Sequence, residues 1–565
     1  MSSLKRITPF LIPSLADIMF VSLFILLSLS VGKGLLNDCD TGYHIRAGEY
    51  IIDTLSIPKH DIFSFISPAL PWTAHEWLSE VIMAAIHRVA GLTGIVIFFS
   101  FMISLVYYLM FKIIRKYNVN ILAASFFTLL VLVTSQIHWL ARPHIFSLVL
   151  MVVWYYLLDK YQYQHEDYLY FLAPMMLLWV NLHGGFLAGF ILIGIYLVGN
   201  VVMFIASEDS KKDLHLQKAK KLGLVTAVCL LVCLINPYTY HILLFPFKLT
   251  SNKFLMDHVS EFLSPNFHIA SIIFFEFFML LALTLFALSR IRLNIIELTL
   301  ILLFTHMSLY SVRYIPLFAI IIAPVLAKQA ESMLERSGGK FISFFKKRAS
   351  NISTIDASAK GYLWPIIAVV IVVFVAAKGK IEHNFNEKTK PVAAVEFLKK
   401  ETLHGNMFDN DEFGDYIIYA AWPQYKVFFD GRSDMYGTDI FKEYFKIIDF
   451  KQGWEKTIEK YDITWIIYNA NSLFSRFLLQ NDDWKLIYAD KVANIFLKKD
   501  IPENQSLIKK YSNVEPVIEI EAEGERLKTE GEKVGKRQIR AQILPSCFLP
   551  SPKAFQVPSY LCFYR

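Results

Sequence analysis

Two aspartates, two residues apart, stand where the first apolar segment of the chain ends. Asp38 and Asp40 follow the hydrophobic stretch 15–36, and a polar segment begins after them. Carboxylates at the mouth of a membrane are costly to desolvate, so a chain keeps them there for a reason. One of them could deprotonate an acceptor nucleophile as a general base, or the pair could bind a divalent cation such as Mg²⁺ or Mn²⁺ through oxygen. Asp38 and Asp40 are therefore candidate catalytic residues and candidate metal ligands, and this cation is the one cofactor that the sequence suggests.

The segment after the aspartates has helical spacing. Between residues 41 and 54 the apolar side chains share one face, which predicts an amphipathic helix that can lie along the membrane surface. Asp40 would stand at its N-cap, and capping is the competing explanation for this residue. His44 lies four residues after Asp40 on the same helical face, so we count it as a third candidate catalytic residue. Its alternative role is that of an interfacial hydrogen-bonding residue.

Cations and imidazoles stand at the ends of other apolar segments. Arg142 and Arg313 could neutralise a phosphate bidentately, whereas a single arginine in such a place more often snorkels to lipid phosphates without specificity. The segment 181–185 ends one apolar stretch and starts the next with almost no linker, so its polar groups must be buried in protein or face water. Glu76 also fits a simpler role as a first-turn helix acid. We predict a substrate-binding set of Arg142, His144, Asn181, His183, Arg313, Glu76 and Asp61.

The composition is that of a multi-pass membrane protein. Hydrophobic residues make up 55% of the chain and aromatic residues 15%, which soluble domains do not sustain. Windows of about 19 residues give about eleven candidate transmembrane helices. They lie near residues 15–36, 93–111, 121–138, 145–158, 169–181, 185–206, 219–236, 269–289, 293–310, 313–327 and 362–377.

The distribution of Lys and Arg predicts the orientation. With the N-terminus, including Lys5 and Arg6, in the cytoplasm, about 20 cations fall on cytoplasmic segments and roughly eight on the opposite loops. The positive-inside rule therefore predicts a cytoplasmic N-terminus and, after an odd number of spans, a C-terminus outside. The candidate site residues then all lie on the outer side. Helix capping alone would not gather these residues on one side of the membrane, because helices need caps at both ends.

Composition divides the chain into three parts. We expect a polytopic transmembrane domain at 1–380 with its first outer loop at 37–92, an outer α/β domain at 381–500, and a disordered tail at 501–565. Within the outer domain the pattern predicts a helix at 392–400 and strands at 416–421, 426–429, 464–468 and 494–498. A turn there carries Asp430, Arg432 and Asp434, which could bind an acceptor or dock the domain on the membrane part.

Several motifs can be read together along the chain. They are DCDTGYHIRAGEYI, PKHDIFSF, HEWLSEV, RPHIFSL, NLHGGFL, NPYTYHIL and VFFDGRSDMYG. Together they resemble a family of bacterial multi-pass membrane proteins grouped with the GT-C glycosyltransferases. The resemblance implies many membrane spans, a C-terminal domain on the outer, periplasmic side of the bacterial inner membrane, and an acidic motif in the first outer loop. That motif maps to Asp38 and Asp40, with Asp40 first because it precedes His44 in the resembling segment.

The resemblance also implies a reaction, the transfer of a sugar from a polyprenyl-phosphate carrier to a lipid, glycan or protein acceptor. A transporter or flippase of lipid-linked sugars is an alternative, but it would need ionisable residues deep in the membrane, where Glu276 and Glu297 are the main examples. A non-catalytic membrane subunit with a partner-binding outer domain is another, and it would tolerate substitution of Asp38 and Asp40. The net charge of +7 is explained by cytoplasmic loops beside anionic lipid, so it does not indicate nucleic-acid binding.

Overall fold

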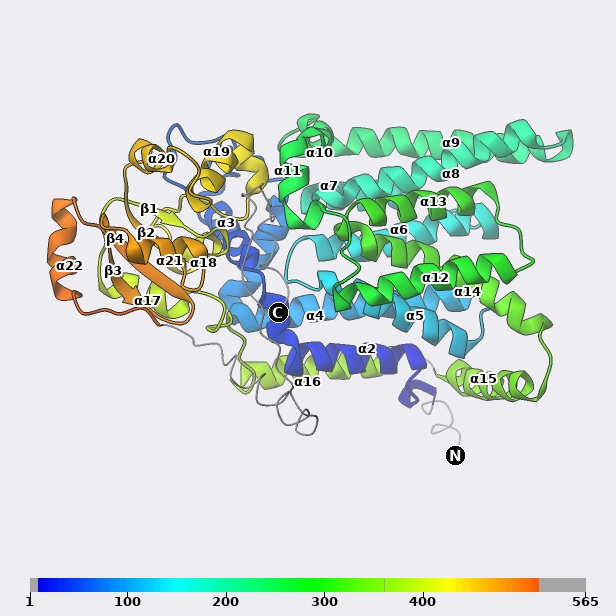
Figure 1. The fold of residues 1–565 in the computed structure, drawn as a ribbon. Coiled ribbons are helices and arrows are strands. Elements are labelled where there is room, and N and C mark those ends of the chain that lie inside the picture. The colour runs from blue at the N-terminus through cyan, green and yellow to red at the C-terminus, as the bar shows by residue number, and fades with distance from the viewer. Residues whose placement is uncertain (1–8, 360, 518–565) are drawn as a thin grey trace, which may run out of the picture. The chain divides into compact units, whose positions relative to one another are not determined.

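The computed structural model describes residues 9–359 and 361–517, and helices dominate it. Each apolar segment predicted from the sequence lies largely within a helix, and these helices lie side by side (Figure 1). They are α2 (Leu15–Ile25), α4 (Trp77–Lys116), α5 (Ile121–Ser135), α6 (His144–Asp159), α7 (Leu172–Leu182), α8 (Leu187–Ala206), α9 (Asp209–Cys233), α12 (Ile273–Leu288), α13 (Ile295–Tyr310), α14 (Ile315–Arg336) and α16 (Leu363–Ala377). The loops between them carry α3 (Asp40–Thr54), α10 (His241–Ser251), α11 (Lys253–His258) and α15 (Lys340–Ser358).

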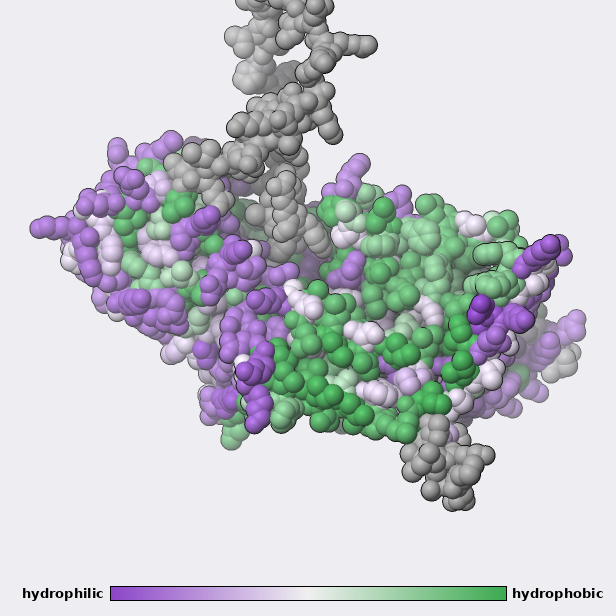
Figure 2. Space-filling view, turned by 90° about the horizontal axis from the view of Figure 1, so that it is seen from below, coloured by the Kyte–Doolittle hydropathy of each residue, from purple (hydrophilic) through white to green (hydrophobic). Residues whose placement is uncertain are grey.

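Six helical segments in the described part of the chain are long and apolar enough to cross a membrane. The number rises to seven if α15 and α16, bent by 71° relative to each other, count as one span. The predicted count of about eleven is not confirmed. α6, α7 and α13 are each shorter than the roughly 20 residues that a crossing needs, and α9, although it has 25 residues, is not among the six. On the face shown in Figure 2, hydrophobic residues cover the helices and hydrophilic residues gather at both ends, as expected for a membrane-embedded band.

The first polar loop folds into α3 and the beginning of α4. Gly91 interrupts α4 with a left-handed φ of 59°, which separates its first turns from its apolar remainder. A Cβ on Gly48 would overlap the Glu80 carbonyl of α4, and a Cβ on Gly42 would lie 2.8 Å from the Cβ of Tyr419 in α18 (Asp411–Ala421). Protein therefore covers α3 on two sides. The predicted position of this helix along the membrane surface stays a prediction.

The C-terminal region is an α/β domain around a four-stranded sheet of order β1-β2-β4-β3. Strand β1 (Asn406–Asp409) is parallel to β2 (Ile463–Asn469), and β4 (Ala493–Lys498) is antiparallel to both β2 and β3 (Trp484–Ala489). The helices that accompany the sheet are α17 (Val392–Lys400), α18, α19 (Ser433–Ile448), α20 (Trp454–Lys460) and α21 (Leu473–Gln480).

Part of this domain was predicted from its pattern. The helix at 392–400 and the strands at 464–468 and 494–498 are confirmed as α17, β2 and β4. Residues 416–421 instead end the helix α18, and residues 426–429 form only an isolated bridge between Val427 and Ser64. The apolar run of residues 416–421 has no alternation that separates a strand from a buried helix.

The domain continues beyond residue 500, where we expected the disordered tail to begin. Residues 502–504 form a 3₁₀ turn and α22 (Gln505–Lys510) follows. The side-chain amide of Asn504 donates to the carbonyls of Thr464 and Lys498 at 3.1 and 2.9 Å, which fastens this segment to the sheet. The remainder of the predicted tail, residues 518–565, lies outside the described residues, as do Lys5 and Arg6.

Arg432 fastens the α/β domain to the polar loop between α3 and α4. Its guanidinium forms ion pairs with Asp430 at 2.6 Å and with Asp61 at 2.9 Å. It also lies over the rings of Phe63 and Trp72, with its carbon 4.9 and 4.7 Å from their centroids. Of the two roles predicted for the cluster around Arg432, docking on the membrane part is the one that the structure shows.

Candidate active site

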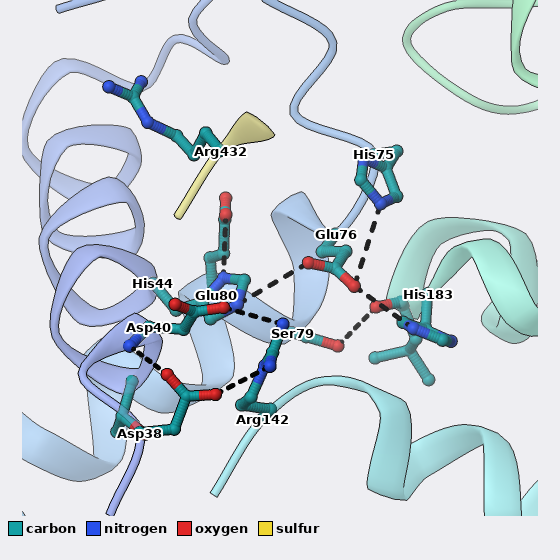
Figure 3. Close-up of polar contacts among 12 residues, drawn as sticks. Asp38, Asp40, His44, His75, Glu76, Ser79, Glu80, Arg142, His183 and Arg432 are labelled. Atoms are coloured by element: carbon teal, nitrogen blue, oxygen red, sulfur yellow. Dashed lines mark hydrogen bonds and ion pairs between the residues drawn. The ribbon is translucent and has the colours of Figure 1, made fainter. Parts of the chain in front are cut away.

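Asp38 and Asp40 converge on Arg142, which comes from the loop before α6 (Figure 3). Arg142 Nη2 lies 2.6 Å from Asp40 Oδ2, and its Nη1 lies 2.7 Å from Asp38 Oδ2. The same Nη1 pairs with Glu261 Oε1 at 2.6 Å, and Arg313 Nη2 lies 3.6 Å from the other oxygen of Glu261. The predicted residues Asp38, Asp40, Arg142 and Arg313 therefore form one chain of alternating charges, and Glu261 is the member that we did not predict.

The two aspartates have different roles in starting α3. The backbone N–H of Asp40 donates to Asp38 Oδ1 at 2.9 Å, whereas the N-cap residue, Cys39, makes no side-chain cap. Asp38 thus satisfies a free N–H at the helix start. Asp40 is the first helical residue and its carboxylate points to Arg142. Asp38, and not Asp40, therefore caps the start of α3. The carboxylate of Asp40 is not used in capping and contacts Arg142.

The surroundings of the Asp40 side chain shift its pKa. Burial raises the pKa of Asp40 well above its ordinary value; the Arg142 guanidinium opposes this and the neighbouring Asp38 adds to it. A carboxylate with a raised pKa is a stronger base than an ordinary aspartate when it is ionised. Burial also raises the pKa of Asp415 in α18, and the charge of Asp40 adds to that shift. Asp415 was not predicted as a site residue.

The turn of the α/β domain that contains Gly431 lies directly against Asp40. Asp415 Oδ1 accepts the backbone N–H of Gly431 at 3.0 Å, which holds that turn. A Cβ on Gly431 would overlap Asp40 Oδ1 and lie 3.1 Å from Asp415 Oδ2. A side chain at residue 431 would therefore require the turn or the Asp40 carboxylate to shift.

Gly431→Ala is expected to reduce the activity that depends on Asp40 while leaving most of the fold in place. The added methyl would push the turn away from Asp40 at a cost of about 1–3 kcal/mol. The activity and the thermal unfolding of the purified variant measure the two effects. Gly34→Ala is the matched control, because the nearest atom to a Cβ there, Asn37 Nδ2, is 3.9 Å away. Wild-type activity of Gly431→Ala would contradict the close approach.

A second polar cluster surrounds Glu76, the residue before α4 (Figure 3). The Nε2 atoms of His183, His44 and His75 lie 3.3, 3.6 and 3.8 Å from its carboxylate oxygens. His44 also lies 3.3 Å from Glu80 through Nδ1. The described structure has no hydrogen bond or ion pair between His44 and Asp40, so His44 belongs to the Glu76 cluster and does not orient Asp40.

The tautomer of His183 follows from its partners. Its Nδ1 accepts the backbone N–H of Gly185 at 2.9 Å and lies 2.7 Å from Ser147 Oγ. A neutral imidazole that accepts at Nδ1 carries its proton on Nε2, so His183 donates toward Glu76. His144 lies beside it, with ring centroids 6.5 Å apart, and donates from Nε2 to the His138 carbonyl at 2.8 Å. His144 therefore lines the cluster without contacting Glu76.

Asn181 and Asp61 both have partners that join elements of the fold, and their predicted role in binding substrate stays a prediction. Asn181 Oδ1 accepts from Trp77 Nε1 at 2.9 Å and from Asn236 Nδ2 at 3.1 Å, which joins α4, α7 and the segment after α9. Asp61 accepts the Phe63 N–H and pairs with Arg432. A buried polar side chain with its hydrogen bonds satisfied serves the fold.

Asn181→Ala is therefore expected to destabilise the protein and to spare the chemistry. It leaves the donors of Trp77 and Asn236 without this acceptor, at a cost of about 1–3 kcal/mol. Thermal unfolding should show the loss, while activity per folded molecule stays near wild type. Asn471→Ala, at an exposed position, is the control. A loss of activity without loss of stability would show that Asn181 acts in the site.

The predicted divalent cation does not fit the side chains as they are arranged. Asp38 and Asp40 both face the guanidinium of Arg142, so its positive charge takes the place between them. Within the described ranges, no group of three or more His, Cys, Asp or Glu side chains is set to hold a metal ion. The cation stays a prediction from the sequence.

Three site residues had weak signals in the sequence. Glu80 lies four residues after Glu76, which places both on one face of α4. Asp415 stands in the motif Phe-Gly-Asp-Tyr, which belongs to α18. Glu261 lies in a short 3₁₀ turn, Ser260–Phe262, far from any apolar periodicity. Only the spacing of Glu80 could have been recognised in advance.

An apolar groove of about 520 Å³ opens next to the Glu76 cluster. It is lined mainly by Trp77, Leu78, Leu177, Leu178, Ile235 and Pro237. Leu178 and Ile235 are exposed on the outer surface of the helices, so the groove opens to the side of the bundle. Its lining suits a hydrocarbon chain.

The chain resembles solved protein structures in its fold, although no sequence comparison finds a relative. No protein-family model and no curated protein matches the chain. The archaeal oligosaccharyltransferase AglB from Archaeoglobus fulgidus, solved with an inhibitory peptide and a dolichol-phosphate, is similar with a TM-score of 0.53 at 12% identity, over 86% of this chain and 74% of AglB. ArnT from Cupriavidus metallidurans, bound to undecaprenyl phosphate, has a TM-score of 0.43 at 12% identity, over 85% of this chain and 97% of ArnT. The likeness to AglB is one of fold alone, and at that level it agrees with the resemblance predicted from the motifs.

Proposed function

We propose that this protein is a glycosyltransferase that moves a sugar from a polyprenyl-phosphate carrier to a lipid, glycan or protein acceptor. The observation that carries the proposal is the pairing of Asp40 with Arg142 at the place where the α/β domain meets the helices. A base and a cation in contact supply the two things that such a transfer needs. The AglB fold, solved with a dolichol-phosphate, supports a lipid-phosphate donor.

Asp40 acts as the general base in this proposal. It accepts the proton of the acceptor hydroxyl as that oxygen forms a bond to the anomeric carbon of the sugar. The bond from that carbon to the phosphate oxygen breaks, and the polyprenyl phosphate leaves with the electron pair. Such a leaving group needs neutralisation of its charge more than it needs a proton.

Arg142 and Arg313 supply that neutralisation. Arg142 is held by three carboxylates, whereas Arg313 has the longest ion pair of the cluster, 3.6 Å to Glu261. An arriving phosphate can therefore contact Arg313 first and then displace Glu261 from Arg142. The apolar groove that begins at Trp77, next to Glu76, would hold the isoprenoid chain.

We place the reaction on the outer face of a bacterial inner membrane, with a cytoplasmic N-terminus and the α/β domain outside. The distribution of cations supports this orientation. Lys112, Arg115 and Lys116 end α4, whereas Asp40 and the α/β domain lie at its other end.

The cellular test is a comparison of membrane glycolipids and glycans by mass spectrometry with and without the protein. We expect one glycosylated product to disappear when the protein is absent and its polyprenyl-phosphate-linked donor to accumulate. If neither changes, the transferase proposal fails.

A further inference from the structure

Helix α15 lies between α14 and α16, at the end of the helices away from the sheet (Figure 1). It is bent by 71° from α16, so it runs across the direction of that apolar helix. Arg115 at the end of α4 donates to Ser353 at 2.9 Å, and Asp356 accepts the Leu15 N–H at 2.6 Å. These bonds hold α15 against the ends of α4 and α2.

Two different stripes run along α15. Ala349 is buried, and the flanking positions at spacings of three and four, among them Ser353, are partly buried, so this stripe packs on the other helices. A neighbouring stripe with the same spacing is exposed. It consists of Phe341, Phe344, Arg348, Ile352 and Ile355, and its apolar members are 80%, 58%, 36% and 63% exposed in that order. Four large apolar side chains on one exposed helix face are costly in water.

The charge of α15 is strongly positive. Lys340, Lys346, Lys347 and Arg348 oppose the single acid Asp356. Lys346 donates to the carbonyls of Glu335 and Ser337 at the end of α14, while Lys347 and Arg348 are exposed. Arg348 also stacks on Phe344, with its guanidinium carbon 5.2 Å from the ring centroid. A long cationic side chain above an apolar stripe can reach lipid headgroups while its stem stays on hydrocarbon.

Two exposed aromatic residues beside α15 indicate the level of the membrane boundary. Tyr362 and Trp364, at the start of α16, are both exposed, and Trp364 donates to the Leu11 carbonyl at 2.9 Å. Exposed Tyr and Trp at the end of an apolar helix favour the boundary between headgroups and acyl chains. α15 ends only a few residues before them, so its apolar stripe lies at the depth where an interfacial helix is stable.

We propose that α15 is an anionic-lipid-binding interfacial helix. Its apolar stripe enters the acyl boundary of the leaflet at the end of the helices opposite Asp40, and Lys347 and Arg348 bind the headgroups of anionic phospholipids. Charge complementarity favours anionic lipid, because each cation near the surface raises the affinity about fivefold. The proposal stands on the surface of α15 and does not depend on the transferase reaction.

Photocross-linking of the full chain tests this proposal. Benzoylphenylalanine is placed at residue 344 in the stripe, or at exposed residue 350 on the opposite face, in vesicles of phosphatidylcholine with phosphatidylglycerol. We expect lipid adducts from 344 and almost none from 350. Adducts to another protein from 344, or equal lipid adducts from both positions, would overturn the interfacial placement.

Charge variants test the headgroup preference in the same vesicles. Lys347→Gln with Arg348→Gln should lower the share of phosphatidylglycerol among the adducts from 344 several-fold. Lys399→Gln with Lys400→Gln, which removes the same charge from the exposed end of α17, should leave it unchanged. An unchanged share in the α15 variant would overturn the preference for anionic lipid.

Discussion

Asp40→Asn is expected to reduce sugar transfer by a factor of about 10²–10⁴, the usual contribution of a general base. The amide cannot accept the acceptor's proton, although its shape is the same. Arg142 keeps its ion pairs with Asp38 and Glu261, at 2.7 and 2.6 Å, so its positive charge stays neutralised. The variant should therefore insert and unfold like the wild type. Turnover of a lipid-linked donor, together with thermal unfolding, measures both properties.

Asp38→Asn is the matched control for this variant. Its amide oxygen can still accept the backbone N–H of Asp40, so the start of α3 is kept. The variant loses one charged partner of Arg142, which is worth about 1.5 kcal/mol or tenfold in rate. A greater loss in Asp38→Asn than in Asp40→Asn would reverse the two roles. If Glu76→Gln abolishes transfer while Asp40→Asn does not, the base is Glu76.

Arg432→Met is expected to destabilise the docking of the α/β domain by about 3–5 kcal/mol, because it leaves two buried carboxylates without their cation. Asp61 and Asp430 are both buried and both pair with this guanidinium. The methionine keeps much of the apolar contact with Phe63 and Trp72. Thermal unfolding and the rate of proteolytic release of the C-terminal domain measure the effect.

Lys451→Met is the control for Arg432→Met. Lys451 pairs with Asp449 at 2.9 Å, but its side chain is exposed, so this pair is worth about 0–1 kcal/mol. The two substitutions remove the same charge from the same domain. Equal stability of the two variants would show that Arg432 does not hold the domain on the first outer loop.

The helices were predictable because their signal is local. An apolar stretch of sufficient length forms a helix in a membrane whatever its neighbours are, since every backbone group must be paired within the segment. Strands 464–468 and 494–498 were recognised because short β-rich segments stood apart from the helical stretches. The same rule failed at 416–421, where a continuous apolar run fits a strand and a buried helix equally well.

The members of the site were predicted better than their contacts. The distribution of Lys and Arg predicted that Asp38, Asp40, Arg142 and Arg313 lie on one side of the membrane. It could not predict that they lie within hydrogen-bonding distance of one another. Arg142 and Asp38 are 104 positions apart along the chain, and no local pattern links residues so distant. Glu261, which joins the two arginines, comes from yet another loop. Such contacts follow from how the helices pack.

Two polar residues that were predicted for the site have partners that join elements of the fold. Asp61 pairs with Arg432, and Asn181 accepts from Trp77 and Asn236. From the sequence, a polar residue at the end of an apolar segment looks the same whether it binds substrate or satisfies a buried donor. Its partners distinguish the two cases, and those of Asp61 lie in the distant α/β domain.

The most direct test of the catalytic role of Asp40 uses the purified full chain with polyprenyl-phosphate-linked sugars and extracted membrane acceptors. Release of polyprenyl phosphate is measured together with glycosylation of the acceptor. We predict that the wild type releases polyprenyl phosphate as the acceptor gains the sugar, and that Asp40→Asn releases almost none. Equal release by both proteins, or none by the wild type with any donor, would contradict the assignment of Asp40 as the base of a membrane glycosyltransferase.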